Sequence, residues 1–369
     1  MNPQSIYEPR RHVVIECADQ TQMRPLDVVL PNFLFRRKVT VLGGPPASGK
    51  GAIEAAIAAR TSRGGSHPSW PDPTPSSQGK VLFFSGNEDD PEDTLKPRLM
   101  AQGADMRNIY FFKGMRQYGN RVDAHFCERD VEALESWMGK VGSGFDLFVV
   151  DPIVQAVDGD STSQAKVLRA LDNLAEVSAR LNVAILGGHH VVKSAKGRDP
   201  LGRVAGPLAY GGKPRAVWVT AHNTNRRTGE DDFVLVNAKA SLTANAGGWS
   251  YRIDSATVAD EYGPLATSVV RWGQRYEGRA SDILQQIERA PKKEADALEK
   301  AIRFLEKLLQ DGPVAYPEIQ RSAMESGISG GTLVRAKKER GITHKKQSGS
   351  KHGAYYWSLP EHCDRQLAA

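Results

Sequence analysis

The segment V-L-G-G-P-P-A-S-G-K-G-A-I-E-A-A, residues 41–56, constrains the fold of this chain more than any other segment. Apolar residues lead into a glycine-rich turn, and alanine-rich sequence typical of a helix follows it. The turn matches the phosphate-binding pattern G-x-x-x-x-G-K-[ST] at Gly44, Gly49 and Lys50, but Gly51 stands where the pattern has Ser or Thr. A strand, a turn of this kind and a helix in this order predict a nucleotide-binding α/β fold.

The chemistry expected of this turn comes mainly from its backbone. Main-chain N–H groups point inward around phosphate groups, and the N-terminus of the following helix favours negative charge. Lys50 would reach the β- and γ-phosphates of a nucleotide. A chance glycine-rich turn is the alternative, which the flanking strand and helix disfavour. The predicted phosphate site consists of Gly44, Pro45, Ala47, Ser48, Gly49, Lys50, Gly51 and Ala52.

Apolar segments typical of strands alternate with helical segments along the rest of the first 240 residues. This alternation predicts an α/β sheet that is mostly parallel. Ligands of such sheets gather at the carboxyl ends of the strands. Strands are predicted over 38–44, 80–86, 108–114, 145–152, 182–190, 216–223 and 231–240, and helices over 51–62, 94–100, 130–141 and 163–181.

Three of these strand ends carry candidate chemical groups. Asp151 closes an apolar run at a position where an acid can hold Mg²⁺, usually through water, and a simple turn cap is the alternative. Glu88 follows another strand and could orient and deprotonate an attacking water, although the two aspartates after it compete for that role. His189 and His190 end a third strand and are candidates for sensing the γ-phosphate. The alternative is one buried structural histidine, and the sequence does not choose between the two.

The loop over residues 191–215 is rich in Lys, Arg and Gly. Such residues can contact a nucleic-acid backbone electrostatically, without sequence preference, and a solvated loop is equally compatible with the pattern. Lys213 and Arg215 stand just before a strand, where Arg215 could reach the γ-phosphate bound to a neighbouring subunit or form a surface ion pair. The candidates for backbone contact are Lys193, Lys196, Arg198 and Arg203.

The pattern changes after residue 275. Residues 276–294 are polar and predict a linker, after which helices are predicted over 294–310, 316–327 and 329–341, and strands over 342–346 and 354–360. Three helices and a basic hairpin predict a winged helix-turn-helix domain. Its third helix would enter a DNA groove and its wing would contact phosphate, whereas docking of a protein partner is the alternative. The candidate nucleic-acid contacts are Arg335, Lys337, Lys338, Arg340, Lys345 and Lys346.

Charge and cysteine content narrow the partner and the compartment. The chain has 369 residues, a net charge of +6 and a pI near 9.1, which suits an anionic partner. Cys17, Cys127 and Cys363 have no metal-type spacing and form no complete disulfide framework. No apolar run approaches the ~20 residues of a membrane helix, and the first residues lack the apolar core of a signal peptide. We expect a cytoplasmic protein with no membrane partner.

Four segments in order, GGPPASGKG, SGNEDDPEDTLKPRLMAQGAD, FDLFVVDP and NVAILGGHHVVK, resemble the RecA-like P-loop ATPases of the RepA hexameric helicase type. These are AAA-family ATPases of phages, plasmids and mobile elements, and the resemblance covers about residues 25–255. It implies a homo-oligomeric ring, usually a hexamer, with ATP and Mg²⁺ bound between subunits and single-stranded DNA in the channel. It also implies that Glu88 is the catalytic carboxylate, Asp151 the metal-side acid and the histidine pair the sensor, while Lys213 and Arg215 act on the neighbouring subunit.

The expected domain order is an N-terminal extension over 1–24, a RecA-like ATPase domain over 25–275, a linker over 276–294, a winged helix-turn-helix domain over 295–360 and a tail over 361–369. The leading hypothesis is a replicative DNA helicase that couples ATP hydrolysis to translocation of single-stranded DNA. The alternative is a slow or non-hydrolysing ATP-binding switch, such as a recombination mediator, loader or DNA-binding regulator. Gly51 favours that alternative, because in the family the side-chain hydroxyl at this position ligates Mg²⁺.

Overall fold

The computed structural model describes residues 13, 15–86, 89–122, 126, 128–141, 144–192, 195–224, 231–244, 247–260, 263–288, 292–346 and 355–360. Two candidate residues from the sequence, Glu88 and Lys193, lie outside these ranges. Most of the predicted N-terminal extension and the whole predicted tail also lie outside them.

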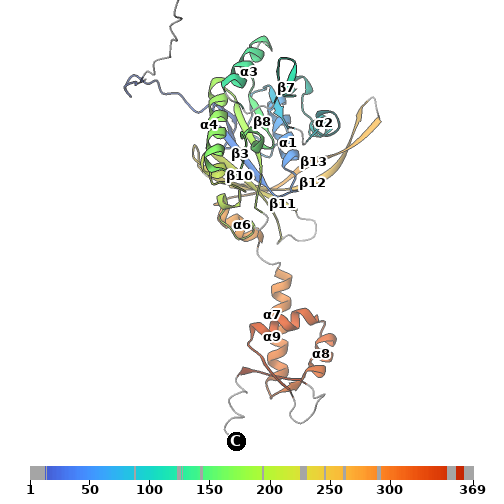
Figure 1. The fold of residues 1–369 in the computed structure, drawn as a ribbon. Coiled ribbons are helices and arrows are strands. Elements are labelled where there is room, and N and C mark those ends of the chain that lie inside the picture. The colour runs from blue at the N-terminus through green and yellow to red at the C-terminus, as the bar shows by residue number, and fades with distance from the viewer. Residues whose placement is uncertain are drawn as a thin grey trace, which may run out of the picture.

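Within the described residues, a nine-stranded sheet forms the centre of the main body (Figure 1). Its strands are β3 (Val39–Gly44), β4 (Val81–Phe84), β5 (Ile109–Phe111), β8 (Leu147–Val150), β9 (Ala184–His190), β10 (Ala216–His222), β11 (Phe233–Ala240), β12 (Gly248–Asp260) and β13 (Gly263–Tyr276). Their order across the sheet is β13-β12-β11-β10-β3-β9-β8-β4-β5. The strands from β10 to β5 pair in parallel, and β11, β12 and β13 extend the sheet with antiparallel pairs. The predicted α/β class with a mostly parallel sheet is confirmed.

Helices cover both faces of the sheet. The helices of the main body are α1 (Lys50–Arg63), α2 (Lys96–Ala101), α3 (Glu128–Val141), α4 (Gln164–Arg180), α5 (Ala209–Gly212) and α6 (Ala280–Glu288). Successive side chains of a strand point to opposite faces, so Val41 joins the core on the side of α3, α4 and α6, while Leu42 joins the core on the side of α1 and α2. Because both faces are covered, the central strands are buried along their whole length.

Two short strand pairs and several single turns complete the main body. The pairs are β1 (Val28–Leu30) with β2 (Leu34–Phe35), and β6 (Met115–Gln117) with β7 (Asn120–Val122). Single turns of 3₁₀-helix occupy Met106–Asn108, Ile153–Ala156 and Leu201–Arg203, and a π-helical turn at Pro91–Leu95 precedes α2.

The predicted linker over 276–294 needs correction. Residues 280–288 form α6, in which Ala280, Ile283, Leu284 and Ile287 are buried in the core beside the sheet. These residues recur at the i, i+3, i+4 and i+7 positions of one helix face, which is the pattern of a packed helix. The polar residues between them are on the solvent side and gave the segment its linker-like composition. The main body therefore continues past residue 275.

The C-terminal module has a hydrophobic core of its own. It contains α7 (Lys292–Leu309), β14 (Val314–Ala315), α8 (Tyr316–Glu325), α9 (Gly330–Glu339), β15 (Thr343–Lys346) and β16 (Tyr355–Ser358), with the strands in the order β14-β16-β15. Leu305, Ile319, Leu333 and Trp357 meet in this core. The helices and the hairpin lie where the sequence predicts them, and β14 is an additional strand. None of the helices in the described part of the chain is both long and apolar enough to cross a membrane.

Candidate nucleotide site

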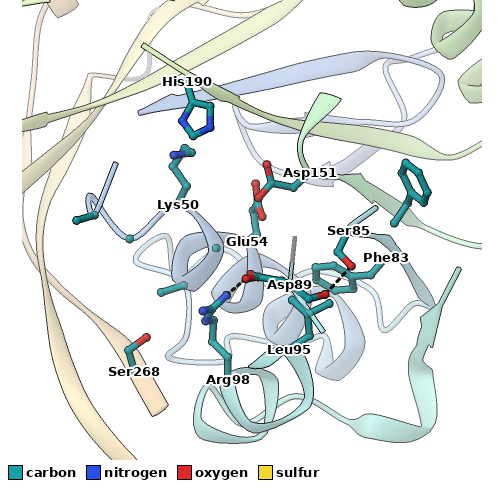
Figure 2. A pocket seen from close by; sticks show the side chains of 15 residues that line it. Lys50, Glu54, Phe83, Ser85, Asp89, Leu95, Arg98, Asp151, His190 and Ser268 are labelled. Carbon is teal, nitrogen blue, oxygen red and sulfur yellow. Dashed lines mark hydrogen bonds and ion pairs between the residues drawn. The ribbon is translucent and has the colours of Figure 1, made fainter. Parts of the chain in front are cut away.

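A pocket lies at the carboxyl end of β3, where α1 begins (Figure 2). The turn over residues 44–51 forms one wall, the ends of β4 and β8 form another, and α2 contributes Arg98. Lys50, Asp151 and His190, three candidates from separate segments of the sequence, all line this pocket. These three residues therefore lie together at the carboxyl ends of parallel strands, which is where the ligands of such sheets bind.

The turn keeps glycine where a side chain would collide with the fold. A Cβ atom on Gly44 would lie 2.3 Å from Thr220 Oγ1 and 2.9 Å from Lys50 Cγ. Gly49 has a φ of 76°, and a Cβ atom there would lie 2.5 Å from Cδ1 of Ile253. The Lys50 ammonium donates a hydrogen bond to the Gly44 carbonyl at 3.2 Å, so it is folded back over the turn. This geometry suits a phosphate group surrounded by main-chain amides and one ammonium.

Three hydrogen bonds, two of them buried and one partly buried, fix the conformation of the turn. Ser48 Oγ donates to the Pro45 carbonyl at 2.8 Å, and Thr220 Oγ1 donates to Ser48 Oγ at 2.9 Å. The Tyr251 hydroxyl donates to the Ser48 carbonyl at 2.7 Å. Burial raises the pKa of Tyr251, so this hydroxyl stays protonated and remains a donor. Thr220 and Tyr251 were not predicted as part of the site, because they come from β10 and β12, which are distant in sequence from the turn.

A buried and a partly buried carboxyl group meet at the end of β8. Asp151 follows β8, and Glu54 belongs to the second turn of α1, with only 3% of its surface exposed. A Cβ atom on Gly188 would lie 2.0 Å from Asp151 Oδ1 and 2.6 Å from Glu54 Oε1, so both groups lie against the Gly188 main chain. Burial raises the pKa of both carboxyls, and the negative charge of Asp151 raises that of Glu54 further. Glu54 was not among the residues predicted from sequence, although an acid in an otherwise apolar, alanine-rich helix was a visible signal.

The carboxyl pair is compatible with a bound divalent cation. Among the described residues, no group of three or more His, Cys, Asp and Glu side chains is arranged to hold a metal ion. Mg²⁺ does not need such a group, because it is usually held by one or two carboxylates together with phosphate oxygens and water. Oε1 of Glu54 is buried and has no hydrogen-bond partner in the geometry of the structure, although the Glu54 and Asp151 carboxyls are close enough to share a proton when no cation is bound. An oxygen ligand without a partner, beside Asp151 and the phosphate turn, is what a hard cation would require.

Gly51, the departure from the phosphate-binding pattern, has a structural reason. A Cβ atom at this position would lie 2.6 Å from Nη1 of Arg98. The same Nη1 donates to Asp89 Oδ2 at 2.8 Å, and the Arg98 and Asp89 side chains are about one-fifth and one-third exposed, respectively. The guanidinium therefore fills the space that a Ser or Thr side chain would need. Arg98 is a pocket residue that was not predicted from the sequence, and Asp89, which was considered only as an alternative to Glu88, also lines the pocket.

The structure separates the two candidate histidines. His190 is exposed and lines the pocket, and Figure 2 shows its ring above Lys50. His189 is buried, donates through Nε2 to the Ala205 carbonyl at 2.9 Å and stacks on Tyr210 at a ring separation of 4.1 Å. Burial lowers the pKa of His189. His189 therefore has a packing role on the other side of the strand, and only His190 is in position to contact a phosphate.

Lys213 and Arg215 lie away from this pocket. Arg215 is exposed just before β10, and its N–H donates to the Val39 carbonyl at 3.1 Å, at the start of β3. The pocket is at the other end of β3, so Arg215 does not line the site of its own chain. Lys213 forms an ion pair with Asp172.

One of the predicted nucleic-acid contacts is wrong. Arg203 has a side chain that is 4% exposed and forms a bidentate ion pair with Glu288 of α6, with Nη2 at 3.0 Å from Oε2. A guanidinium buried in this way cannot contact a DNA backbone without unfolding the loop. Lys196 and Arg198 of the same loop are exposed.

The predicted basic contacts of the C-terminal module fall into two groups. Lys337 lies over the Trp357 ring at 4.6 Å and Arg340 pairs with Glu306, so both are engaged within the module. The predicted contacts that remain exposed are Arg335 and Lys338 on α9 and Lys345 and Lys346 on β15.

Comparison with known proteins agrees with this geometry. Residues 5–196 match a family model described as an AAA domain, and this range spans just over half of the chain. The matched range includes the phosphate turn, Glu54, Asp151 and the histidine pair. No curated protein matches the chain. Because a strand, a phosphate turn, a helix and an acidic strand end all fall inside the matched range, the chain belongs to the AAA-domain family of nucleotide-binding P-loop ATPases.

Proposed function

We propose that this protein is an ATP-dependent, DNA-acting motor, a hexameric helicase of the RepA type that couples ATP hydrolysis to translocation of single-stranded DNA. The observation that supports this most is the placement of its charged groups at two ends of one sheet. Lys50, Asp151 and His190 line the pocket at the carboxyl ends of the strands, and Arg215 is exposed at the opposite end. In a ring of head-to-tail subunits, Arg215 of one subunit can face the pocket of the next.

The candidate catalytic and binding residues have separate roles in this proposal. The amides of the 44–51 turn and Lys50 hold the triphosphate, and His190 detects the γ-phosphate. Glu88 orients and deprotonates the attacking water. Mg²⁺ held beside Asp151 would neutralise charge that develops on the phosphates.

DNA contacts are assigned to exposed basic side chains. Lys196 and Arg198 belong to the loop after β9, the strand that ends at the pocket residue His190. In this proposal the loop transmits the nucleotide state of the pocket to the DNA strand in the ring channel. The C-terminal module is proposed to be a winged helix-turn-helix that binds duplex DNA or a protein partner through the exposed basic side chains of α9 and β15. Its contacts there are Arg335, Lys338, Lys345 and Lys346.

A non-motor function is the second candidate. Residue 51 is glycine and Arg98 fills the space beside it, so the hydroxyl that ligates Mg²⁺ in the family that the sequence resembles is absent. Such a site would bind ATP and hydrolyse it slowly, and the bound nucleotide would set an assembly state on DNA. Under this second function the chain is a mediator, loader or regulator.

ATP hydrolysis measured with and without single-stranded DNA separates the two candidates. Strong stimulation by DNA that disappears in Lys50→Ala supports the motor, whereas ATP binding without DNA-stimulated turnover supports the switch. Lys140→Ala, at an exposed lysine of α3 with no role in this proposal, serves as the control.

A mixing experiment tests whether Arg215 acts on the nucleotide pocket of the neighbouring subunit. Lys50→Ala and Arg215→Ala are each expected to be inactive alone, but mixed rings contain interfaces with an intact Lys50 and an intact Arg215. Mixing the two variants should therefore restore part of the ATPase activity. Two inactive variants that stay inactive after mixing and reassembly would refute the ring arrangement.

A further inference from the structure

Glu54 is an acid in the buried part of α1. Its helix neighbours Ala52, Ile53, Ala55 and Ile57 are all buried apolar residues. Glu54 is itself 3% exposed, and its Oε1 has no hydrogen-bond partner. A buried carboxyl is retained in a folded protein when a proton or a cation compensates it.

The position of Glu54 points to a cation. Its carboxyl group lies beside that of Asp151 against the Gly188 main chain, where a side chain at residue 188 would displace both. Figure 2 shows the two carboxyl groups facing each other, on the side of α1 that carries Lys50. Both side chains line the pocket that the phosphate turn encloses. Their oxygens are thus available to an ion bound next to a nucleotide phosphate.

The usual protein ligand for that ion cannot be provided by residue 51. The residue is glycine, and Arg98, held by Asp89, fills the space beside it. Glu54 is three residues further along the same helix, which places it on a neighbouring part of the same helix face. An acid at this position can replace a ligand that is missing one turn earlier.

We propose that Glu54 takes over the metal-binding role of the absent hydroxyl at position 51 and forms, with Asp151, a two-carboxylate site for the divalent cation of the bound nucleotide. This inference rests on the nucleotide binding of the proposed function, and it assigns a role to a residue that the phosphate-binding pattern does not include. Water and phosphate oxygens would complete the octahedral shell that Mg²⁺ prefers. The site would remain competent for Mg²⁺ without Ser or Thr.

The test measures affinity for a fluorescent ADP analogue in EDTA and in Mg²⁺, and needs no catalytic turnover. In the wild type, Mg²⁺ should tighten binding. In Glu54→Gln, which keeps the side-chain size, affinity in EDTA should be retained and the gain from Mg²⁺ should fall about tenfold or more, since even indirect metal partners contribute that much. Glu318→Gln, the same change on an exposed residue of the C-terminal module, should keep the full gain.

Two further measurements make the outcomes decisive. Binding of Mn²⁺ to the ADP complex, followed by electron paramagnetic resonance, should weaken in Glu54→Gln, and the melting temperature of the nucleotide-free variant shows whether it is folded. A folded Glu54→Gln variant with an unchanged Mg²⁺ gain and unchanged Mn²⁺ affinity would overturn the proposal. A wild type that binds no nucleotide in either buffer would overturn the proposed function instead, so the two failures are distinguishable.

Discussion

Replacing Gly51 by alanine tests whether Arg98 fills the space that the phosphate-binding pattern gives to a side chain. The new Cβ atom would lie 2.6 Å from Arg98 Nη1, so the guanidinium must shift, which weakens its 2.8 Å bond to Asp89. Alanine in place of glycine stabilises a helix interior by about 1 kcal/mol, which is an upper bound for Gly51, the second residue of α1. A partly exposed ion pair contributes about 0.2–1 kcal/mol, so the two effects should nearly cancel in the wild-type background.

A double-mutant cycle of Gly51→Ala with Arg98→Ala isolates the contribution of the Arg98 side chain. In Arg98→Ala, no ion pair opposes the substitution, so Gly51→Ala should increase the free energy of unfolding by up to about 1 kcal/mol. The coupling between the two sites equals the ion-pair contribution and is therefore expected to be about 0.2–1 kcal/mol, which urea unfolding of the nucleotide-free protein can measure if the m-value stays constant.

Gly139→Ala is the matched control for this cycle. Gly139 lies in α3, and a Cβ atom added there would have no other side chain or backbone within 4 Å, so alanine should add the same stability with or without Arg98. If Gly51→Ala stabilised the protein equally in both backgrounds, as Gly139→Ala should, the reasoning about Arg98 would be wrong.

Three other predictions concern stability. Arg203→Ala leaves a buried carboxylate unpaired and should lower the free energy of unfolding by about 3–5 kcal/mol in urea titrations, whereas Lys196→Ala in the same loop should change it by less than ~0.5 kcal/mol. An effect of equal size in both variants would argue against the ion pair. Tyr251→Phe removes the donor to the Ser48 carbonyl and should cost about 1–2 kcal/mol and weaken nucleotide binding; unchanged binding would mean that this bond does not support the turn. His189 has a lowered pKa in the folded state, so the unfolded chain binds more protons as pH falls and stability should drop through the range below pH ~6.5. His189→Gln should reduce that drop in melting experiments between pH 7.5 and 5, and an identical pH profile would count against a buried neutral imidazole.

The central sheet could be predicted because its signals are local. The strand β3, the phosphate turn and α1 follow one another in sequence. The strands β8 and β9 are buried on both faces, so each is a continuous apolar run that predicts a strand without knowledge of the neighbouring strands. Asp151 and His190 follow these runs directly, and the rule for parallel sheets then brings them together.

The parts that the sequence did not predict depend on contacts between distant residues. The hairpin of β12 and β13 was not predicted, since polar and apolar residues mix along its partly exposed length. Helix α6 was predicted to be part of a linker because polar residues lie among its four buried apolar residues in the sequence. Arg203 resembled its exposed neighbours in the basic loop, and only the position of Glu288, 85 residues later, shows that it is buried.

The most direct measurement of the central claim is the affinity of the purified protein for ATP in the presence of Mg²⁺, determined by calorimetry for the wild type, Lys50→Ala and the control Lys338→Ala. Hydrogen bonds to charged groups contribute about 1.5–3 kcal/mol, so Lys50→Ala should bind roughly ten- to hundredfold more weakly while the control matches the wild type. Absence of binding to any nucleoside triphosphate by the wild type, or equal affinity in Lys50→Ala, would contradict the account.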